Sequence, residues 1–255
     1  MVKDNLKSIR FIMLVLVTCS LAACASTASR QTEGAGSGVA KEVDPWEGFN
    51  RAVFRFNMTL DRWILKPVAK GYDAVLPDPV QKGVGNFFDN IGEVGNIAND
   101  VFQWKWKQAG NDTGRLLTNS TLGLFGIFDV ASKFGLDEND GEDVGQTFEK
   151  WGVKSGPYLV LPIFGPSTVR EAISMPVDYV LDPVTYVDPV EAKYGLSATR
   201  IVDERADLLD IEDLASGDLY LFVREAYLQR RSYLEKDGEM EDEQFLDDFG
   251  DEEEW

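Results

Sequence analysis

A short pattern that starts helices occurs three times in this chain and constrains its fold class more than any other feature. The pattern is Asp-Pro, any residue, then Glu or Gln, and it begins at Asp44, Asp78 and Asp188. Aspartate can cap free N–H groups, proline fits the first helical position, and the acid or amide three residues later completes a capping box. Residues 168–171 (TVRE) are a weaker fourth case. The chain is therefore predicted to be mostly α-helical.

Hydrophobic spacing supports this prediction. From Trp46 to Trp63, apolar residues follow one another at intervals of three and four, as on one face of a helix. Asn50 and Asn57 belong to a second face beside that stripe. One interpretation buries the apolar stripe in the core, and the other lets the asparagines face a polar lumen. This segment alone leaves both open.

Three other regions complete the fold prediction. Apolar spacing between residues 208 and 233 predicts two more amphipathic helices. Residues 79–110 predict short helices broken by glycine and packed closely. The segment YLVLP (158–162) predicts at most one short extended piece. Residues 44–234 are expected to form a single domain.

The N-terminus has the pattern of a secretory signal. Three basic residues among the first ten precede an apolar run at 11–17 that is too short to span a bilayer. The run ends in Leu-Ala-Ala-Cys at 21–24, which resembles a bacterial lipobox. Residues 1–23 are therefore predicted to be a lipoprotein signal peptide. Cys24 becomes an acylated first residue, followed by a flexible tether to residue 43; the alternative is a plain signal peptide with an incidental cysteine.

The charge distribution is strongly uneven. The chain carries a formal net charge of −19, and residues 235–255 contain twelve acidic residues and one lysine. Such a block repels itself and is predicted to be a disordered acidic tail. Its role is either solvation or the docking of a basic partner. The sequence shows no basic patch that suits nucleic acid.

The sequence lacks the residues that most catalytic and metal-binding sites require. The chain has no histidine, which excludes Ser-His-Asp and Cys-His machinery and histidine metal sites. The acidic segment 137–143 lacks the glycine and glutamate positions of a calcium loop. Gly83-Val84-Gly85 lacks the third glycine of a dinucleotide loop. We therefore expect no enzyme, no catalytic residue, no metal and no cofactor.

The segment between Arg115 and Asp129 has 13 residues without a charge. A helix of that length measures ~20 Å, which is short of the ~30 Å hydrocarbon core of a bilayer. The segment therefore cannot span a membrane. It predicts either a buried hairpin inside a helical bundle or a helix–turn–helix that lies in one leaflet.

Four segments carry a family resemblance: DPWEGFNRAVFRFN (44–57), LLTNSTLGLFGIFDVAS (116–132), GQTFEKWGVKSGPYLVLPIFGPSTVRE (145–171) and FVREAYLQRR (222–231). In this order they resemble the MlaA (VacJ) family of outer-membrane lipoproteins. The resemblance covers nearly all of 44–234, whereas the acidic tail has no clear counterpart in the family pattern.

The resemblance implies a ring of helices that lies in the plane of the periplasm-facing, inner leaflet of the outer membrane, lipid-anchored at its N-terminus. A trimeric porin stands beside the ring. An amphipathic channel lets phospholipids mislocalised to the outer leaflet leave toward a soluble periplasmic carrier protein. This maintains lipid asymmetry without a cofactor. The alternative function is an outer-membrane-tethered scaffold that recruits a basic partner through its acidic tail.

The resemblance also implies roles for particular residues. The channel or gating candidates are Asn50, Phe56, Asn57 and Met58. The membrane-embedded candidates are Leu122, Leu124, Phe125, Ile127 and Phe128. Arg170 is a candidate phosphate contact, and the alternative for Arg170 is an ion pair with Glu171 or with another helix acid.

Overall fold

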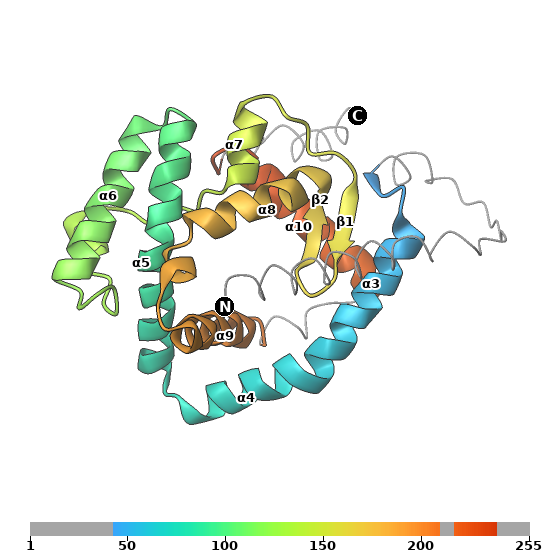
Figure 1. Ribbon diagram of the computed structural model, residues 1–255, viewed down its shortest axis with the longest axis horizontal. Helices are drawn as coiled ribbons and strands as arrows, with labels where there is room; N and C mark the ends of the chain where they lie inside the picture. Colours follow the sequence, from blue (N-terminus) through green and yellow to red (C-terminus); the bar gives the residue numbers. More distant parts are fainter. Residues whose placement is uncertain (1–42, 210–216, 239–255) are drawn as a thin grey trace, which may run out of the picture. The chain divides into compact units, whose positions relative to one another are not determined.

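The computed structural model describes residues 43–209 and 217–238 (Figure 1). Its longer helical elements are α3 (Glu47–Leu60), η2 (Asp61–Leu65), α4 (Lys66–Val75), α5 (Asp78–Phe102), α6 (Trp106–Thr121), α7 (Val144–Lys150), α8 (Val169–Leu181), α9 (Val190–Asp207) and α10 (Leu219–Glu235). The short elements are η3 (Ala131–Phe134), η4 (Pro183–Tyr186), β1 (Tyr158–Leu161) and β2 (Gly165–Thr168). The prediction of a mostly α-helical chain is confirmed. The predicted signal peptide, Cys24, the tether and residues 239–255 lie outside the described residues.

The described elements form a closed circuit of contacts. α3 continues through the π-helical η2 into α4, which gives the curved helix in Figure 1. α4 packs along α9, α9 contacts α5, and α5 contacts α8. α8 contacts β2, β2 pairs with β1, and β1 returns to α3. α6 packs along α5, and α10 contacts both β2 and α7.

The three Asp-Pro patterns mark helix starts, but not by the predicted mechanism. α3 begins three residues after Asp44, α5 begins at Asp78, and α9 begins two residues after Asp188; none of these helices has a side-chain cap. The Asp44 carboxylate is instead buried and bonded to side chains of α3 and α10. The weaker fourth pattern does act as a cap, because the Thr168 hydroxyl accepts from a backbone N–H in the first turn of α8 at 3.4 Å.

The prediction of short, glycine-broken helices is wrong, because the glycine-rich region forms the long helix α5. Gly83, Gly85, Gly92 and Gly95 all lie inside this helix. Gly83 is buried, and a Cβ added there would lie 3.2 Å from a side-chain methyl of Ile127. Glycine at this position thus lets the segment after α6 approach α5 closely. Local helix propensity does not reveal such a tertiary constraint.

β1 and β2 form an antiparallel hairpin, with Tyr158 opposite Thr168 and Leu161 opposite Gly165. The sequence predicts only the first of these strands. β2 has the sequence GPST, which lacks the alternating apolar residues that identify a strand. The second strand therefore follows from its pairing with β1 rather than from its own composition.

The interior of the described residues is poor in apolar side chains. Its buried residues include 12 hydrophobic and 20 polar or charged ones, whereas 36 large hydrophobic side chains are exposed. The apolar cluster is built around Phe54, Tyr158, Val160 and Tyr220. Phe54 and Tyr220 pack edge to face with ring centroids 5.5 Å apart. This distribution is the reverse of that in a domain surrounded by water.

The reversal is clearest in α3, where the interpretation of the apolar stripe as core is wrong. Phe49, Phe56 and Trp63 on that stripe are 49%, 51% and 76% exposed. The neighbouring face points inward, because Asn50 is completely buried and Phe54 is 9% exposed. Within the described part of the chain, no helix is both long and apolar enough to cross a bilayer.

Candidate functional site

The uncharged segment begins as the last residues of α6 and ends in an exposed turn, so it forms neither a buried hairpin nor a complete helix–turn–helix. α6 ends at Thr121, and the following residues make irregular turns before η3. All five membrane-embedded candidates are exposed, with Phe125 at 75%. We call this segment, residues 122–128, the apolar turn. Its exposed side chains are Leu122, Leu124, Phe125, Ile127 and Phe128.

Polar side chains beneath the apolar turn hold its backbone in place. The Asn86 amide donates to the Ile127 carbonyl oxygen at 3.1 Å. The Asn119 side-chain oxygen accepts from two backbone N–H groups, those of residues 130 and 131, each at 2.8 Å. Gly126 has a φ of +93°, and a Cβ there would lie 2.4 Å from the Asn90 Cβ. Glycine is therefore required, and the apolar side chains are directed outward from a fixed backbone.

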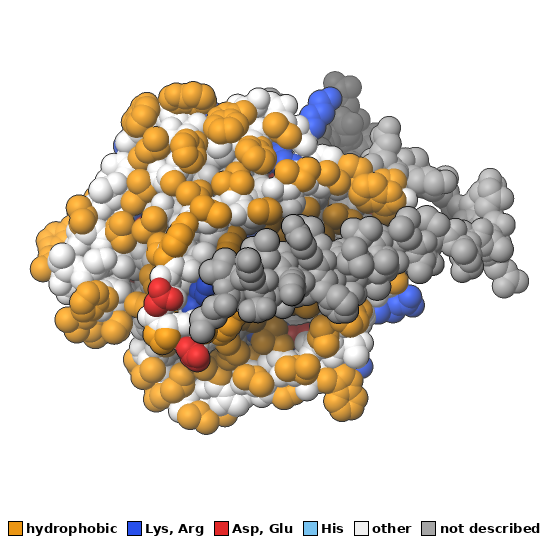
Figure 2. All heavy atoms as spheres, viewed as in Figure 1, with side chains coloured by type: hydrophobic (Ala, Val, Ile, Leu, Met, Phe, Trp, Pro, Cys, Tyr) orange, Lys and Arg blue, Asp and Glu red, His pale blue; other side chains and the backbone are white. Residues whose placement is uncertain are grey.

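Exposed apolar side chains are not confined to this turn. Figure 2 shows hydrophobic side chains over much of the visible face. At the tip of the β1–β2 hairpin, Ile163 and Phe164 are 76% and 74% exposed. Others lie on α4, on α8 and around the turn between α5 and α6, and they include Val68, Val75, Phe102, Trp104, Trp106, Ile173, Val177 and Val180.

The gating candidates Asn50 and Asn57 join α3 to the edge of β1. The Asn50 amide donates to the Tyr158 carbonyl oxygen at 3.1 Å, and its oxygen accepts from the Val160 N–H at 2.9 Å. Two helical turns later, the Asn57 side chain bonds the backbone of residues 161 and 163 at 2.9 and 2.8 Å. The two amides thus pair with β1 much as a neighbouring strand does.

The other two gating candidates lie on different sides of α3. Phe56 is exposed on the outer stripe. Met58 is half-buried and packs against the apolar cluster. The structure thus brings Asn50, Asn57 and Met58 to the side of α3 that meets the hairpin, and it leaves Phe56 on the opposite side.

Arg170 is 2% exposed and surrounded by protein partners. Its Nε donates to Glu171 at 3.0 Å, one terminal nitrogen donates to the Val153 carbonyl oxygen at 3.1 Å, and the other pairs with Glu235. The ion pair with Glu171 expected from the sequence as the alternative to phosphate is therefore present. A phosphate could reach this guanidinium only by displacing a carboxylate.

A second buried arginine joins α6 to α5. Arg115 is 3% exposed; its Nε donates to Glu93 at 2.9 Å, and a terminal nitrogen donates to the Leu136 carbonyl oxygen at 2.8 Å. Burial raises the pKa of Glu93, and the hydrogen bond from Arg115 opposes that shift. The pair therefore satisfies two charges that would be costly to bury separately.

Two aspartates face each other between α5 and α6. Asp100 and Asp112 are both completely buried. Burial first, and then the neighbouring Asp112 carboxyl group, raise the pKa of Asp100 to about 8. Asp112 accepts from the side-chain amides of Gln108 and Asn139, both at 2.7 Å. Burial of Asp100 therefore favours its neutral, protonated form.

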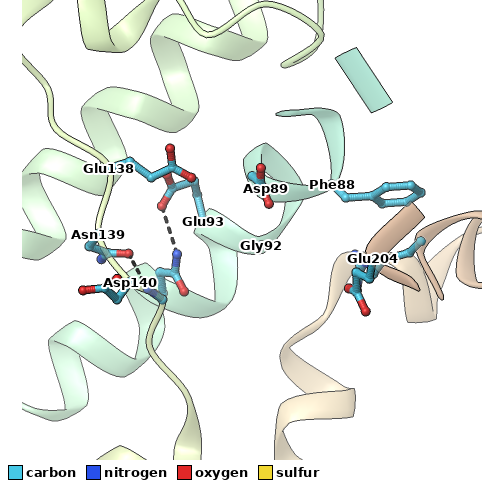
Figure 3. Close-up of a pocket in the computed structure, with 11 residues that line it drawn as sticks. Phe88, Asp89, Gly92, Glu93, Glu138, Asn139, Asp140 and Glu204 are labelled. Atoms are coloured by element: carbon cyan, nitrogen blue, oxygen red, sulfur yellow. Dashed lines mark hydrogen bonds between the residues drawn. The ribbon is translucent and has the colours of Figure 1, made fainter. Parts of the chain in front are cut away.

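A cavity of about 300 Å³ lies between α5, residues 138–141 and α9 (Figure 3). Carboxylates dominate its lining, with Asp89 and Glu93 from α5, Glu138 from the connecting segment and Glu204 from α9. Desolvation and the neighbouring acids, Glu138 first, raise the pKa of Asp89 to about 6. The cavity attracts cationic groups and disfavours a bare phosphate. Among the described residues, no group of three or more potential ligands is arranged to hold a metal ion.

Sequence patterns do not identify several residues of these surfaces. Asn86, Asn90 and Asn119 hold the apolar turn, and only the spacing of four between the first two hints at a shared helix face. Trp104 and Trp106 are exposed beside the turn between α5 and α6. Sequence alone makes such tryptophans ordinary core candidates.

Comparisons with known proteins assign the family. Residues 42–234 match the family described as MlaA lipoprotein. The chain belongs to the MlaA family. The intermembrane phospholipid transport system lipoprotein MlaA of Escherichia coli K12 is 34% identical, with 91% of each chain covered. The protein of the same name from Haemophilus influenzae is 32% identical over 79% of this chain and 83% of its own length.

A solved structure supports the same family at the level of the fold. It is described as the "Structural basis for maintenance of bacterial outer membrane lipid asymmetry". It aligns with a TM-score of 0.67 and 32% sequence identity, covering 75% of this chain and 98% of the solved one. An uncharacterised protein of Rickettsia conorii is 35% identical over 84% of this chain and 90% of its own length.

Proposed function

We propose that this chain transports phospholipid out of the outer membrane toward the periplasm and thereby helps to maintain outer-membrane lipid asymmetry. The observation that carries the proposal is the reversed burial, with 36 large hydrophobic side chains outside and 20 polar or charged residues inside. The names of the E. coli and H. influenzae relatives specify intermembrane phospholipid transport.

Hydrocarbon is the environment that favours such a surface. Helices satisfy their own backbone hydrogen bonds and can therefore lie in a leaflet without crossing it. Transfer of the five exposed side chains of the apolar turn into lipid would contribute roughly 5–10 kcal/mol, at ~1.5–3 kcal/mol for each full burial and less for partial burial. This supports in-plane placement in the inner leaflet, with the acyl group of Cys24 as a second attachment.

The closed circuit of elements supports a route for the lipid. A headgroup passing through the circuit would need polar surroundings, and the interior supplies them. The circuit closes where β1 meets α3, at the contacts of Asn50 and Asn57. A change at these residues, or at Phe56 and Met58 beside them, would alter that closure and so control opening. A trimeric porin and a periplasmic carrier protein complete the proposed pathway.

The apolar turn offers a direct test. A strain that lacks the gene should display phospholipid in its outer leaflet, and the wild-type gene should remove it. The double variant Leu124→Asp/Phe125→Asp should fail to restore asymmetry while the protein remains folded and acylated. The matched control is Lys82→Asp, a charge change at an exposed position of α5.

Photo-crosslinking in native membranes provides the second measurement. Probes at Leu124 and Phe164, both exposed, should form adducts with lipid or porin, whereas a probe at the buried Tyr158 should not. Normal outer-leaflet composition in the deletion strain would contradict transport. Full activity of the double variant would contradict the role of the apolar turn.

A further inference from the structure

The helix that runs from α3 into α4 passes through η2, the one π-helical segment among the described residues (Figure 1). The N–H of Lys66 donates to the carbonyl oxygen of Asp61, five residues earlier, whereas the N–H of Asp61 still donates to Asn57, four residues earlier. No side chain of η2 is buried, and Trp63 and Ile64 are 76% and 61% exposed. Single π-turns are frequent at functional sites and are a recognised cause of kinks in helices. No buried side chain of its own therefore fixes the bend at η2.

The two arms of this helix belong to different walls of the circuit. α3 is bonded to β1 through Asn50 and Asn57, and we call these two elements the α3 wall. α4 packs along α9, and the hydroxyl of Tyr72 donates to Asp203 across that contact. We call α4 and α9 the α4 wall. η2 therefore joins two packed units, and a change in its bend alters the distance between them.

One ion pair connects the bend to the α4 wall. Asp61, the first residue of η2, accepts two hydrogen bonds from Arg205 of α9, one from Nε at 2.7 Å and one from a terminal nitrogen at 3.0 Å. The two side chains are only 16% and 12% exposed, so water screens this pair less than it screens a surface ion pair. A guanidinium that makes two parallel hydrogen bonds also fixes the orientation of the carboxylate. The pair therefore fixes the position of the bend relative to α9.

We propose that η2 is a hinge and that the Asp61–Arg205 pair is the latch that sets its angle. The inference rests on the proposed lipid route, because the hinge adjusts the spacing of two walls of the circuit. α4 has ten residues and measures ~15 Å at ~1.5 Å per residue. A change of ~15° at η2 thus moves its far end, and α9 packed along it, by ~4 Å. The contacts of Asn50 and Asn57 with β1 stay intact during this movement.

The test measures distances between spin labels on the full-length lipoprotein in native membranes by pulsed electron paramagnetic resonance. The chain has no cysteine after Cys24, so introduced cysteines are labelled selectively. Labels at Ala52 of α3 and Ala198 of α9, both exposed, report the spacing of the two walls. Labels at Ala74 of α4 and Ala198 lie within the α4 wall and provide the reference distance. Asp61→Asn should shift or broaden the first distance by ~2–4 Å and leave the reference distance unchanged.

Two further variants control for the loss of charge. Glu47→Gln removes an ion pair with Arg51 inside α3 and should change neither distance. Arg205→Lys keeps the positive charge but loses the planar pair of donors, so its effect should be intermediate. A first distance that changes no more in Asp61→Asn than in Glu47→Gln would overturn the inference. Equal broadening of both distances would also overturn it, because the substitution would then have loosened the α4 wall itself.

Phospholipid export is measured in the same strains. Asp61→Asn should change the phospholipid content of the outer leaflet about twofold or more, because loss of even a weak ion pair shifts a two-state equilibrium by that factor. A shifted distance with unchanged export would overturn the role of the hinge in transport. A wild-type gene that fails to lower outer-leaflet phospholipid would instead contradict the proposed function, and the distances would still test the hinge.

Discussion

The side chain of Asn50 offers the sharpest test of how the circuit is held closed. The substitution is Asn50→Ala, and its matched control is Asn57→Ala in the same helix. Both asparagines donate to one backbone carbonyl of the hairpin segment and accept from one N–H. They differ in burial, because Asn50 is completely buried and Asn57 is only partly buried.

The expected loss of stability follows from the groups that lose a hydrogen-bond partner in Asn50→Ala. Asn50→Ala leaves the Tyr158 carbonyl and the Val160 N–H without their bonds inside the protein, and each such orphan costs ~1–3 kcal/mol. Asp44 also loses the amide that donates to it at 2.8 Å, although Tyr220 and Arg224 still contact it. The total is about 4 kcal/mol, a large part of the ~5–15 kcal/mol that stabilises a domain.

Asn57→Ala should cost below ~1 kcal/mol, because water can replace the amide at the exposed tip of the hairpin. The assay is guanidinium unfolding of both variants in the same detergent, together with hydrogen exchange of the Val160 N–H. Faster exchange of that N–H is expected only in Asn50→Ala. Equal destabilisation by the two substitutions, or a loss below ~1 kcal/mol for Asn50→Ala, would refute the reasoning.

Three further predictions concern the interior. Gly145→Ala should destabilise the protein by ~1–3 kcal/mol in chemical unfolding, because a Cβ at this position would lie 1.6 Å from Glu171 Oε2. The control Gly48→Ala should instead stabilise the protein by ~0.5–1 kcal/mol, because a Cβ there would meet no atom within 4 Å. Asp100 has a folded pKa raised to about 8 from 3.8, so its contribution to stability is complete below about pH 4 and declines as the pH rises through 8. Asp100→Asn should therefore flatten the fall in stability between pH 4 and 8, and an unchanged pH profile would contradict the raised pKa of Asp100. Arg115→Ala should lower the free energy of unfolding by ~3–5 kcal/mol at neutral pH, because the buried carboxylate of Glu93 in α5 loses its cationic partner. A loss below ~1 kcal/mol in the same assay would mean that water or another cation replaces the guanidinium.

Local physical chemistry explains why much of the secondary structure is predictable from the sequence. The Asp-Pro patterns place three helix starts within three residues, although their carboxylates do not cap. Intervals of three and four identify α3 as a helix with two distinct faces. The family motifs between residues 44 and 231 specify the family independently of any coordinates. Each of these signals lies within a short stretch of chain, where the responsible contacts are also local.

The site depends on contacts that local signals do not encode. Asn50 bonds Val160 across 110 residues of sequence, and no local pattern links the two. The apolar turn departs from both predicted forms, because its backbone is held by asparagines of α5 and α6. Gly83 looks like a helix breaker, yet it is the position where α5 meets Ile127. Packing between distant segments therefore decides which of several locally allowed conformations is adopted.

The sequence by itself determined a helical, acidic chain without histidine and assigned it to a family. Only the tertiary structure decided which face of each helix is buried. Periodicity divides a helix into an apolar and a polar face, but it carries no information about the medium that surrounds the fold. In α3 the polar face points inward because hairpin backbone groups and a buried carboxylate need its amides, and the aromatic face is left outside.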